Sequence, residues 1–301
     1  MRLARFWLVL VLLAGWGWAR AEPPPPIAIG FYLPVIRDVP RGDVELSLRF
    51  WVDELGAAGN LSFKPIRLYD NMADLRRDMK SGEVNFMIAT SMGIVQNFAL
   101  DELADGFTAL KSLPDHLLLV VRRSSGIRGL SDLTGKRLAI LDGDELSQVY
   151  LETLLLKSGA KQLQSTLDGA SREKRSVSLV HHLFFDKADA ALIYRNAFEA
   201  ALAMNPQIGQ QLQVLDAYSF KGRSPYIGFF SSRVAPQDAQ AITKAALTVG
   251  STARGRQVLD IYNADQMVVT RVQDLEPFRD LLAENRALKT VLLTARKKGS
   301  Q

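Results

Sequence analysis

Hydroxyl-bearing side chains follow the strands expected in the first part of the chain. Tyr32 ends the first strand, Tyr69 ends the second, and Thr90 and Ser91 stand where the third strand turns into a helix. In open α/β sheets, ligands bind beyond the carboxyl ends of the strands. Hydroxyl and backbone N–H groups at a strand-to-helix turn suit an anion. These four residues are therefore candidate ligand-binding residues, with helix capping by Ser91 as the alternative.

A strongly acidic turn follows an apolar strand in the middle of the chain. Residues 142–147 read Asp-Gly-Asp-Glu-Leu-Ser. Three carboxylates would repel an anionic ligand, although acidic residues also favour a helix N-terminus. Asp142 or Asp144 would instead meet the amine of a cationic or zwitterionic ligand, and Ser147 keeps a hydroxyl. In a zwitterion, the anionic end would meet Thr90 and Ser91.

Three further polar residues are expected at the edge of the same cleft. Tyr194 and Arg195 end a buried strand, and Tyr226 begins another. Arg195 can bind a ligand carboxylate through two parallel hydrogen bonds. A surface or interdomain salt bridge is the alternative for Arg195, and core packing is the alternative for Tyr226.

The residue types needed for nucleophilic or metal catalysis are scarce. The sequence has no cysteine and three histidines, of which His181 and His182 are adjacent. Adjacent side chains diverge on a helix or a strand, so this pair does not chelate a metal. A solvated face is favoured for the pair over a ligand-sensing position. We expect no catalytic residue, no metal and no cofactor, and therefore no enzyme.

The N-terminus has the order of a secretory signal peptide. Arg2 and Arg5 precede an apolar stretch at residues 6–18, and small residues flank Arg20. This order predicts cleavage after Ala21, with residues 1–21 as the signal peptide. An uncleaved membrane anchor is the alternative. Because no cysteine is present, the protein is not expected to be a lipoprotein. An unanchored exported protein indicates the periplasm, with free secretion as the alternative.

Composition and charge exclude several classes of partner. About half of the 301 residues are hydrophobic, and the formal net charge is +5. Removal of a signal that contains three arginines and no acid leaves about +2. This bias is too weak to indicate nucleic acid or anionic lipid as a partner. The length suits one large domain or two ordinary ones.

Strand-like and helix-like segments alternate along the chain. Leu48, Trp51 and Leu55 recur at helical spacing, which predicts a helix over residues 44–55. Asn71 can cap the next helix, and Gly82 can end it. Alternation of this kind predicts an α/β fold with parallel sheets covered by helices.

Five segments in order resemble the phosphonate-type solute-binding proteins of ABC transporters, which have the type II periplasmic binding protein fold. The most recognisable is the turn Asp-Leu-Thr-Gly-Lys at 132–136, which resembles the turn at the start of the family's second lobe. The segments are residues 30–34, 69–86, 129–139, 187–194 and 224–259. The family carries hydroxyl and glycine residues where this chain has its acidic turn, and the carboxylates of that turn would repel the family's usual phosphonate ligand.

The resemblance implies two lobes, each a mostly parallel sheet flanked by helices, joined by a two-strand hinge. Lobe 1 would combine residues 22–116 and 220–301, and lobe 2 would be residues 117–219. A ligand that contacts both lobes would favour a closed state.

The resemblance also implies the partners. A monomer would capture a small anionic or zwitterionic ligand in the periplasm and deliver it to the membrane permease of an ABC importer. A sensor partner of a membrane receptor kinase is the alternative, and an enzyme on the same fold is less favoured.

Overall fold

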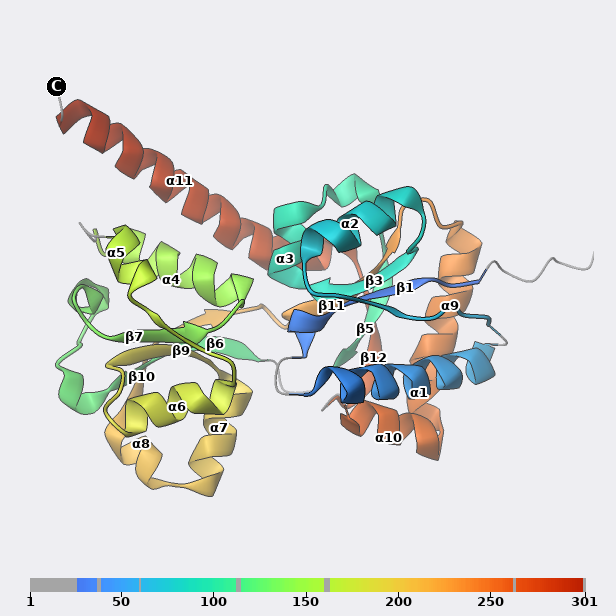
Figure 1. Cartoon of the computed structure of the whole chain (residues 1–301), viewed down its shortest axis with the longest axis horizontal. Coiled ribbons are helices and arrows are strands. Elements are labelled where there is room, and N and C mark those ends of the chain that lie inside the picture. The colour runs from blue at the N-terminus through green and yellow to red at the C-terminus, as the bar shows by residue number, and fades with distance from the viewer. Residues whose placement is uncertain are drawn as a thin grey trace, which may run out of the picture.

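The computed structural model describes residues 26–36, 39–59, 61–111, 115–159, 163–261 and 264–299. The predicted signal peptide and its cleavage site lie outside these residues. Within them, the elements form two groups that lie side by side, each built around a five-stranded sheet (Figure 1). The α/β fold predicted from the sequence is confirmed.

The first sheet has the strand order β2-β1-β3-β11-β4. β1 pairs in parallel with β2 and β3, whereas β11 pairs antiparallel with β3 and β4, so β11 runs against the other four strands. A smaller antiparallel sheet pairs β5 with β12. The strands are β1 (Ile29–Tyr32), β2 (Arg67–Tyr69), β3 (Phe86–Thr90), β4 (Leu103–Ala104), β5 (Gly106–Leu110), β11 (Tyr226–Ser231) and β12 (Gln266–Thr270).

The second sheet has the order β10-β6-β9-β7-β8. β7 pairs in parallel with β8 and β9, and β6 runs antiparallel between β9 and β10. Each large sheet of the described chain is thus mostly parallel by strand direction, with one reversed strand. The strands are β6 (His116–Arg122), β7 (Leu138–Leu141), β8 (Ser171–Glu173), β9 (Ala190–Tyr194) and β10 (Leu212–Ser219).

Helices flank both sheets. Those of the first group are α1 (Arg41–Gly59), α2 (Met72–Ser81), α3 (Ser91–Asn97), α9 (Pro236–Thr248) and α10 (Ala253–Ile261). Those of the second group are α4 (Glu145–Lys157), α5 (Leu163–Asp168), α6 (Ser176–Phe184), α7 (Arg195–Met204) and α8 (Gln207–Gln211). Short 3-10 turns are η1 (Leu33–Val35), η2 (Leu100–Glu102), η3 (Arg123–Ser125), η4 (Leu130–Leu133), η5 (Val249–Ser251) and η6 (Val272–Leu275).

Local sequence signals account for several boundaries. The Asn71 side chain accepts a hydrogen bond from the Asp74 backbone N–H and caps α2, and Gly82 ends that helix in the left-handed conformation with φ 83°. Only glycine adopts that conformation readily. Leu48, Trp51 and Leu55 are buried on one face of α1, as their spacing predicts. That helix runs on to Gly59, past Gly56, because a single glycine costs only about 1 kcal/mol inside a helix.

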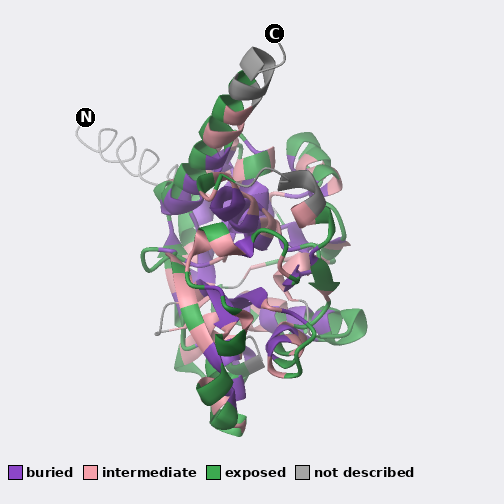
Figure 2. Cartoon of the chain, turned by 90° about the vertical axis from the view of Figure 1, so that its left-hand side faces the viewer, coloured by how far each residue is buried: buried purple, intermediate pink, exposed green. Residues whose placement is uncertain are grey.

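Each group has its own buried core (Figure 2). In the first, the rings of Phe86 and Phe107 stack with centroids 4.5 Å apart, and Phe230 packs against both. In the second, leucine side chains of α4 pack on β6 and β7. Large buried side chains of this kind contribute about 1.5–3 kcal/mol each.

The C-terminal helix α11 (Glu276–Gly299) connects the two groups. Leu275, just before it, packs in the core of the first group, whereas Phe278 and Leu281 pack in the core that contains α4. The Asn285 amide donates to Thr153 Oγ1 at 3.1 Å. In Figure 1, α11 extends past α4 and α5. None of the helices in the described part of the chain has the length and apolar character needed to cross a membrane.

Candidate ligand-binding site

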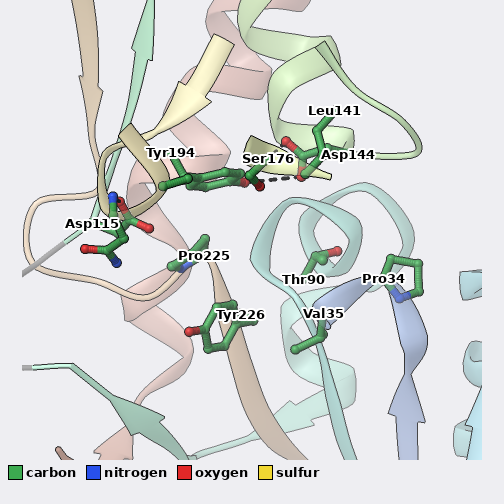
Figure 3. Close-up of a pocket in the computed structure, with 12 residues that line it drawn as sticks. Pro34, Val35, Thr90, Asp115, Leu141, Asp144, Ser176, Tyr194, Pro225 and Tyr226 are labelled. Carbon is green, nitrogen blue, oxygen red and sulfur yellow. Dashed lines mark hydrogen bonds between the residues drawn. The ribbon is translucent and has the colours of Figure 1, made fainter. Parts of the chain in front are cut away.

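A cavity of about 220 Å³ lies between the two groups of elements. Thr90 and Tyr226 line it from the first group, and Asp144 and Tyr194 line it from the second (Figure 3). Thr90 and Tyr194 end β3 and β9, and Tyr226 reaches the same edge because β11 is antiparallel and pairs it with Thr90. The cavity therefore lies where strand ends of both sheets meet, as the fold requires of a ligand site.

Asp144 is a buried carboxylate of the cavity wall that accepts several hydrogen bonds. It is 3% exposed and caps α4 by accepting the Ser147 backbone N–H at 2.9 Å. The Tyr194 hydroxyl lies 3.2 and 3.3 Å from its two oxygens, and the Ser147 hydroxyl also donates to it. Ser147 is fully buried and is not among the residues that line the cavity. Its hydroxyl therefore supports Asp144.

Asp115, directly before β6, supplies a second carboxyl group. It accepts backbone N–H groups from His116 at 2.8 Å and from Asn196 at 3.3 Å. Burial raises the pKa of Asp115 above its usual range, and these hydrogen bonds oppose the rise. The pKa of Tyr226 is raised by burial and by the nearby charge of Asp115. Among the described residues that line the cavity, none is basic.

A carboxylate of the second group reaches across to the first. Glu145 is the first residue of α4, and its Oε1 accepts the Tyr32 hydroxyl at 2.7 Å. Its Oε2 lies 3.2 Å from Thr90 Oγ1, which donates to it. Thr90 Oγ1 also accepts the Gly93 N–H at 3.3 Å and so caps α3. Tyr32 and Thr90 therefore meet a protein carboxylate beside the cavity.

Two of the candidate residues from the first group are held in other contacts. Ser91 is fully buried, and its hydroxyl donates to the Ser224 carbonyl at 2.7 Å. The cap of α3 is Thr90, so the alternative of capping by Ser91 is wrong. The Tyr69 hydroxyl donates to Asp78 at 2.8 Å, and burial raises its pKa to about 12. Neither Ser91 nor Tyr69 lines the cavity.

Besides Ser147, two further candidates from the second group lie outside the lining. Asp142 is exposed, and its backbone N–H donates to the Glu173 carbonyl at 2.8 Å. Arg195 begins α7, and its Nε lies 3.8 Å from Glu199 one turn later. This geometry agrees with the surface salt bridge considered for Arg195.

The histidine pair lies on α6. His181 is exposed and packs beside Phe185, and His182 Nδ1 lies 3.3 Å from Glu173. The two rings have different neighbours, as expected for adjacent positions on a helix.

Sequence reasoning missed Asp115 and Asn196, and it treated Glu145 as part of an acidic turn that repels anions and favours a helix N-terminus. Asp115 precedes a strand, so the rule that ligands meet the carboxyl ends of strands passes over it. It reaches the cavity because β6 is the reversed strand, and Leu117 therefore pairs with Tyr194 at the end of β9.

The two-group α/β fold with a cavity between strand ends is that of a periplasmic binding protein. A family model described as "ABC transporter, phosphonate, periplasmic substrate-binding protein" matches residues 49–275. The chain belongs to this family. It is a substrate-binding transporter component of the periplasm, which confirms the class predicted from the sequence. A search of curated proteins gives no match.

Solved structures share the fold at low identity. PhnD1 from Prochlorococcus marinus, in complex with methylphosphonate, is 12% identical with a TM-score of 0.63, covering 88% of this chain and 99% of that one. XAC2383 from Xanthomonas citri, bound to chloride, is 16% identical with a TM-score of 0.65 over 88% and 99%. The aliphatic sulphonate binding protein SsuA from Escherichia coli is 15% identical, with a TM-score of 0.53 over 88% and 94%.

Proposed function

We propose that this chain captures a small zwitterionic solute between two lobes and delivers it to the permease of an ABC importer. The observation that carries the proposal is the cavity, because both sheets contribute polar side chains to one space. Its volume of about 220 Å³ lies below the ~300–1,000 Å³ usual for drug-sized ligands. A small metabolite suits that size.

The lobes in this proposal are residues 22–116 with 220–301, and residues 117–219. The separate sheets support this division, since β1–β5, β11 and β12 lie on one side and β6–β10 on the other. α11 packs on the core of the second group and adds a connection beyond the two hinge segments. A ligand held by Thr90 and Asp144 together would favour the closed arrangement of the lobes.

The ligand chemistry follows from the lining. Carboxyl groups of Asp115 and Asp144 suit an ammonium group, and the phenol rings of Tyr194 and Tyr226 also suit a cation. The hydroxyl of Thr90 in the lining, and that of Tyr32 beside it, suit the anionic end of the same molecule. A zwitterion such as an aminoalkylphosphonate combines these features, and the family's ligand class supports its anionic half.

A thermal-shift series on the protein purified from the periplasm of an expression host tests the proposal. The probes are 2-aminoethylphosphonate, methylphosphonate, inorganic phosphate and ethanolamine. We expect the zwitterion to raise the melting temperature most, because binding to the native state stabilises it. Asp115→Asn should weaken that shift, whereas Glu45→Gln, which removes an exposed charge from α1, should leave it unchanged. Failure of all four probes, and of amino acids added in the same way, would reject the proposal.

A further inference from the structure

Glu145 makes a contact between the two groups of elements that local structure does not require. α4 is already capped by Asp144, whose carboxylate accepts the Ser147 N–H. The Glu145 side chain turns instead toward the other sheet and accepts the hydroxyls of Tyr32 and Thr90, one on each oxygen. A carboxylate that only favours the start of its own helix would not need these partners.

The first group is shaped to let a carboxylate approach. Tyr32 and Thr90 are both 7% exposed, so their hydroxyls are held in place by packing. A Cβ added at Gly93 would lie 3.3 Å from Glu145 Oε1 and 2.6 Å from Thr90 Oγ1, so glycine leaves the room that the carboxylate uses. Two fixed donors beside a gap of this kind form a receptor for one anionic group.

We infer that Glu145 is a built-in competitor: its carboxylate occupies the place on Tyr32 and Thr90 that the anionic group of a ligand takes, and it clasps the lobes together until that ligand displaces it. The inference rests on the proposed function, since it concerns the ligand of the same cleft. One pair of hydroxyl donors cannot serve two anions at once, and like charges side by side repel. Glu145 therefore determines specificity, because only an anion with further contacts in the cavity can replace it.

The first experiment measures the affinity of the wild-type protein and its variants for methylphosphonate by calorimetry. Glu145→Ala removes the carboxylate that both hydroxyls meet and should tighten binding at least about tenfold, since hydrogen bonds to a charged group are worth that much. Glu145→Gln keeps the shape of the side chain without its charge, so its affinity should lie between those of the wild type and Glu145→Ala. Glu45→Gln, which breaks only an exposed pair with Arg49, is the matched control and should bind like the wild type. Equal or weaker binding by a folded Glu145→Ala protein overturns the inference.

The second experiment measures lobe closure without any ligand. The sequence has no cysteine, so two introduced cysteines can be labelled specifically for energy transfer. Leu46 on α1 and Met204 on α7 are 54% and 85% exposed and suit Leu46→Cys and Met204→Cys. We expect Glu145→Ala to shift the ligand-free distribution toward longer distances than Glu45→Gln does. An unchanged distribution overturns the clasp.

The two experiments separate this inference from the proposed function. If no probe binds any variant and yet Glu145→Ala opens the lobes, the proposed ligand class and the competitor role both fail, and only the clasp stands. If 2-aminoethylphosphonate binds wild type and Glu145→Ala equally and the distances agree, the proposed function stands and the competitor role fails.

Discussion

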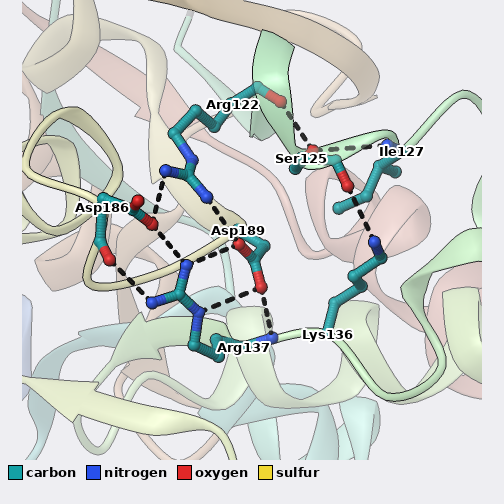
Figure 4. A network of polar contacts seen from close by, with 7 residues as sticks. All are labelled: Arg122, Ser125, Ile127, Lys136, Arg137, Asp186 and Asp189. Carbon is teal, nitrogen blue, oxygen red and sulfur yellow. Dashed lines mark hydrogen bonds and ion pairs between the residues drawn. The ribbon is translucent and has the colours of Figure 1, made fainter.

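Carboxylates at the two ends of the paired strands β6 and β9 have different kinds of hydrogen-bond partner. At one end, Asp189 accepts Arg137 Nη2 at 2.7 Å and Arg122 Nη2 at 2.9 Å, with Asp186 beside both arginines (Figure 4). At the other end, Asp115 accepts backbone N–H groups, and Tyr194 donates its hydroxyl to Asp144. The two sets lie at opposite ends of these strands, because antiparallel pairing places Arg122 near Asp189 and Leu117 beside Tyr194.

This difference in partners indicates that the Asp189 end stabilises the fold and that the other end binds ligand. At the Asp189 end, each acid pairs with guanidinium groups of the same group of elements. These contacts therefore do not depend on the other lobe. At the other end, Asp115, Asp144 and Tyr194 line the cavity. Glu145, next to Asp144 in the chain, accepts a hydrogen bond from a side chain of the other group of elements. Substitutions at the first end should therefore act on stability, and substitutions at the second end should act mainly on binding.

The largest effect is expected at Asp189. Its side chain is 13% exposed, and Asp189→Ala would leave Arg122, 15% exposed, without that partner. Breaking such a pair from one side costs about 3 kcal/mol. Urea unfolding followed by tryptophan fluorescence would measure the loss. Asp186→Ala is the control: that side chain is 63% exposed, so about 1 kcal/mol or less is expected. Equal effects at the two positions would contradict the ranking.

The two ends should also respond to pH in opposite directions. The guanidinium of Arg137 holds the pKa of Asp189 well below its usual range. The stability that Asp189 contributes is therefore present above pH ~4 and is lost as the pH falls below that value. Burial raises the pKa of Asp115, so the native state holds this proton longer than the unfolded chain. Asp115 therefore costs stability as the pH rises from about 4 through its raised pKa.

Unfolding measured between pH 3 and 8 would check the signs. Relative to the wild type, Asp189→Asn should flatten the loss of stability below pH ~4. The stability of Asp115→Asn should increase relative to that of the wild type as the pH rises above that value. Parallel curves for the two variants would show that the ends do not differ.

Tyr194→Phe should have a smaller effect on stability and a clear one on binding. It removes the hydroxyl that donates to Asp144 and leaves the ring in place. A hydrogen bond to a charged group is worth about 1.5–3 kcal/mol, and the length of this one favours the lower figure as the expected loss of stability. The affinity for the zwitterionic probe should fall as well, because Tyr194 and Asp144 both line the cavity. Tyr218→Phe is a control, since its hydroxyl donates to the Pro277 carbonyl instead. A fall in stability without any change in affinity would mean that Tyr194 has a structural role, like the residues at the Asp189 end.

How much of this contrast the sequence predicts depends on whether a contact is local. Helix caps such as Asn71 and apolar spacing such as that in α1 lie within a few residues, so the sequence predicts them. The strand-end rule finds Thr90 and Tyr194 in the cavity lining, whereas Tyr226 begins β11 and reaches the lining because that strand is antiparallel. One expected polar contact is diverted by a partner distant in sequence, because the Ser91 hydroxyl donates to the Ser224 carbonyl. The bond between Glu145 and Tyr32 depends on how two separately formed sheets meet, which no short pattern encodes.

The smallest effect is expected at the pair formed by Arg195 and Glu199. Arg195 follows Tyr194 in the chain, yet its Nε lies 3.8 Å from a Glu199 side chain that is 58% exposed. An exposed pair one helical turn apart contributes about 0.5 kcal/mol or less. Glu199→Ala should therefore change neither urea unfolding nor the affinity for the zwitterionic probe measurably. A loss of affinity in that variant would mean that Glu199 orients Arg195 toward the ligand, and Arg195 would then rejoin Tyr194 at the binding end of the ladder.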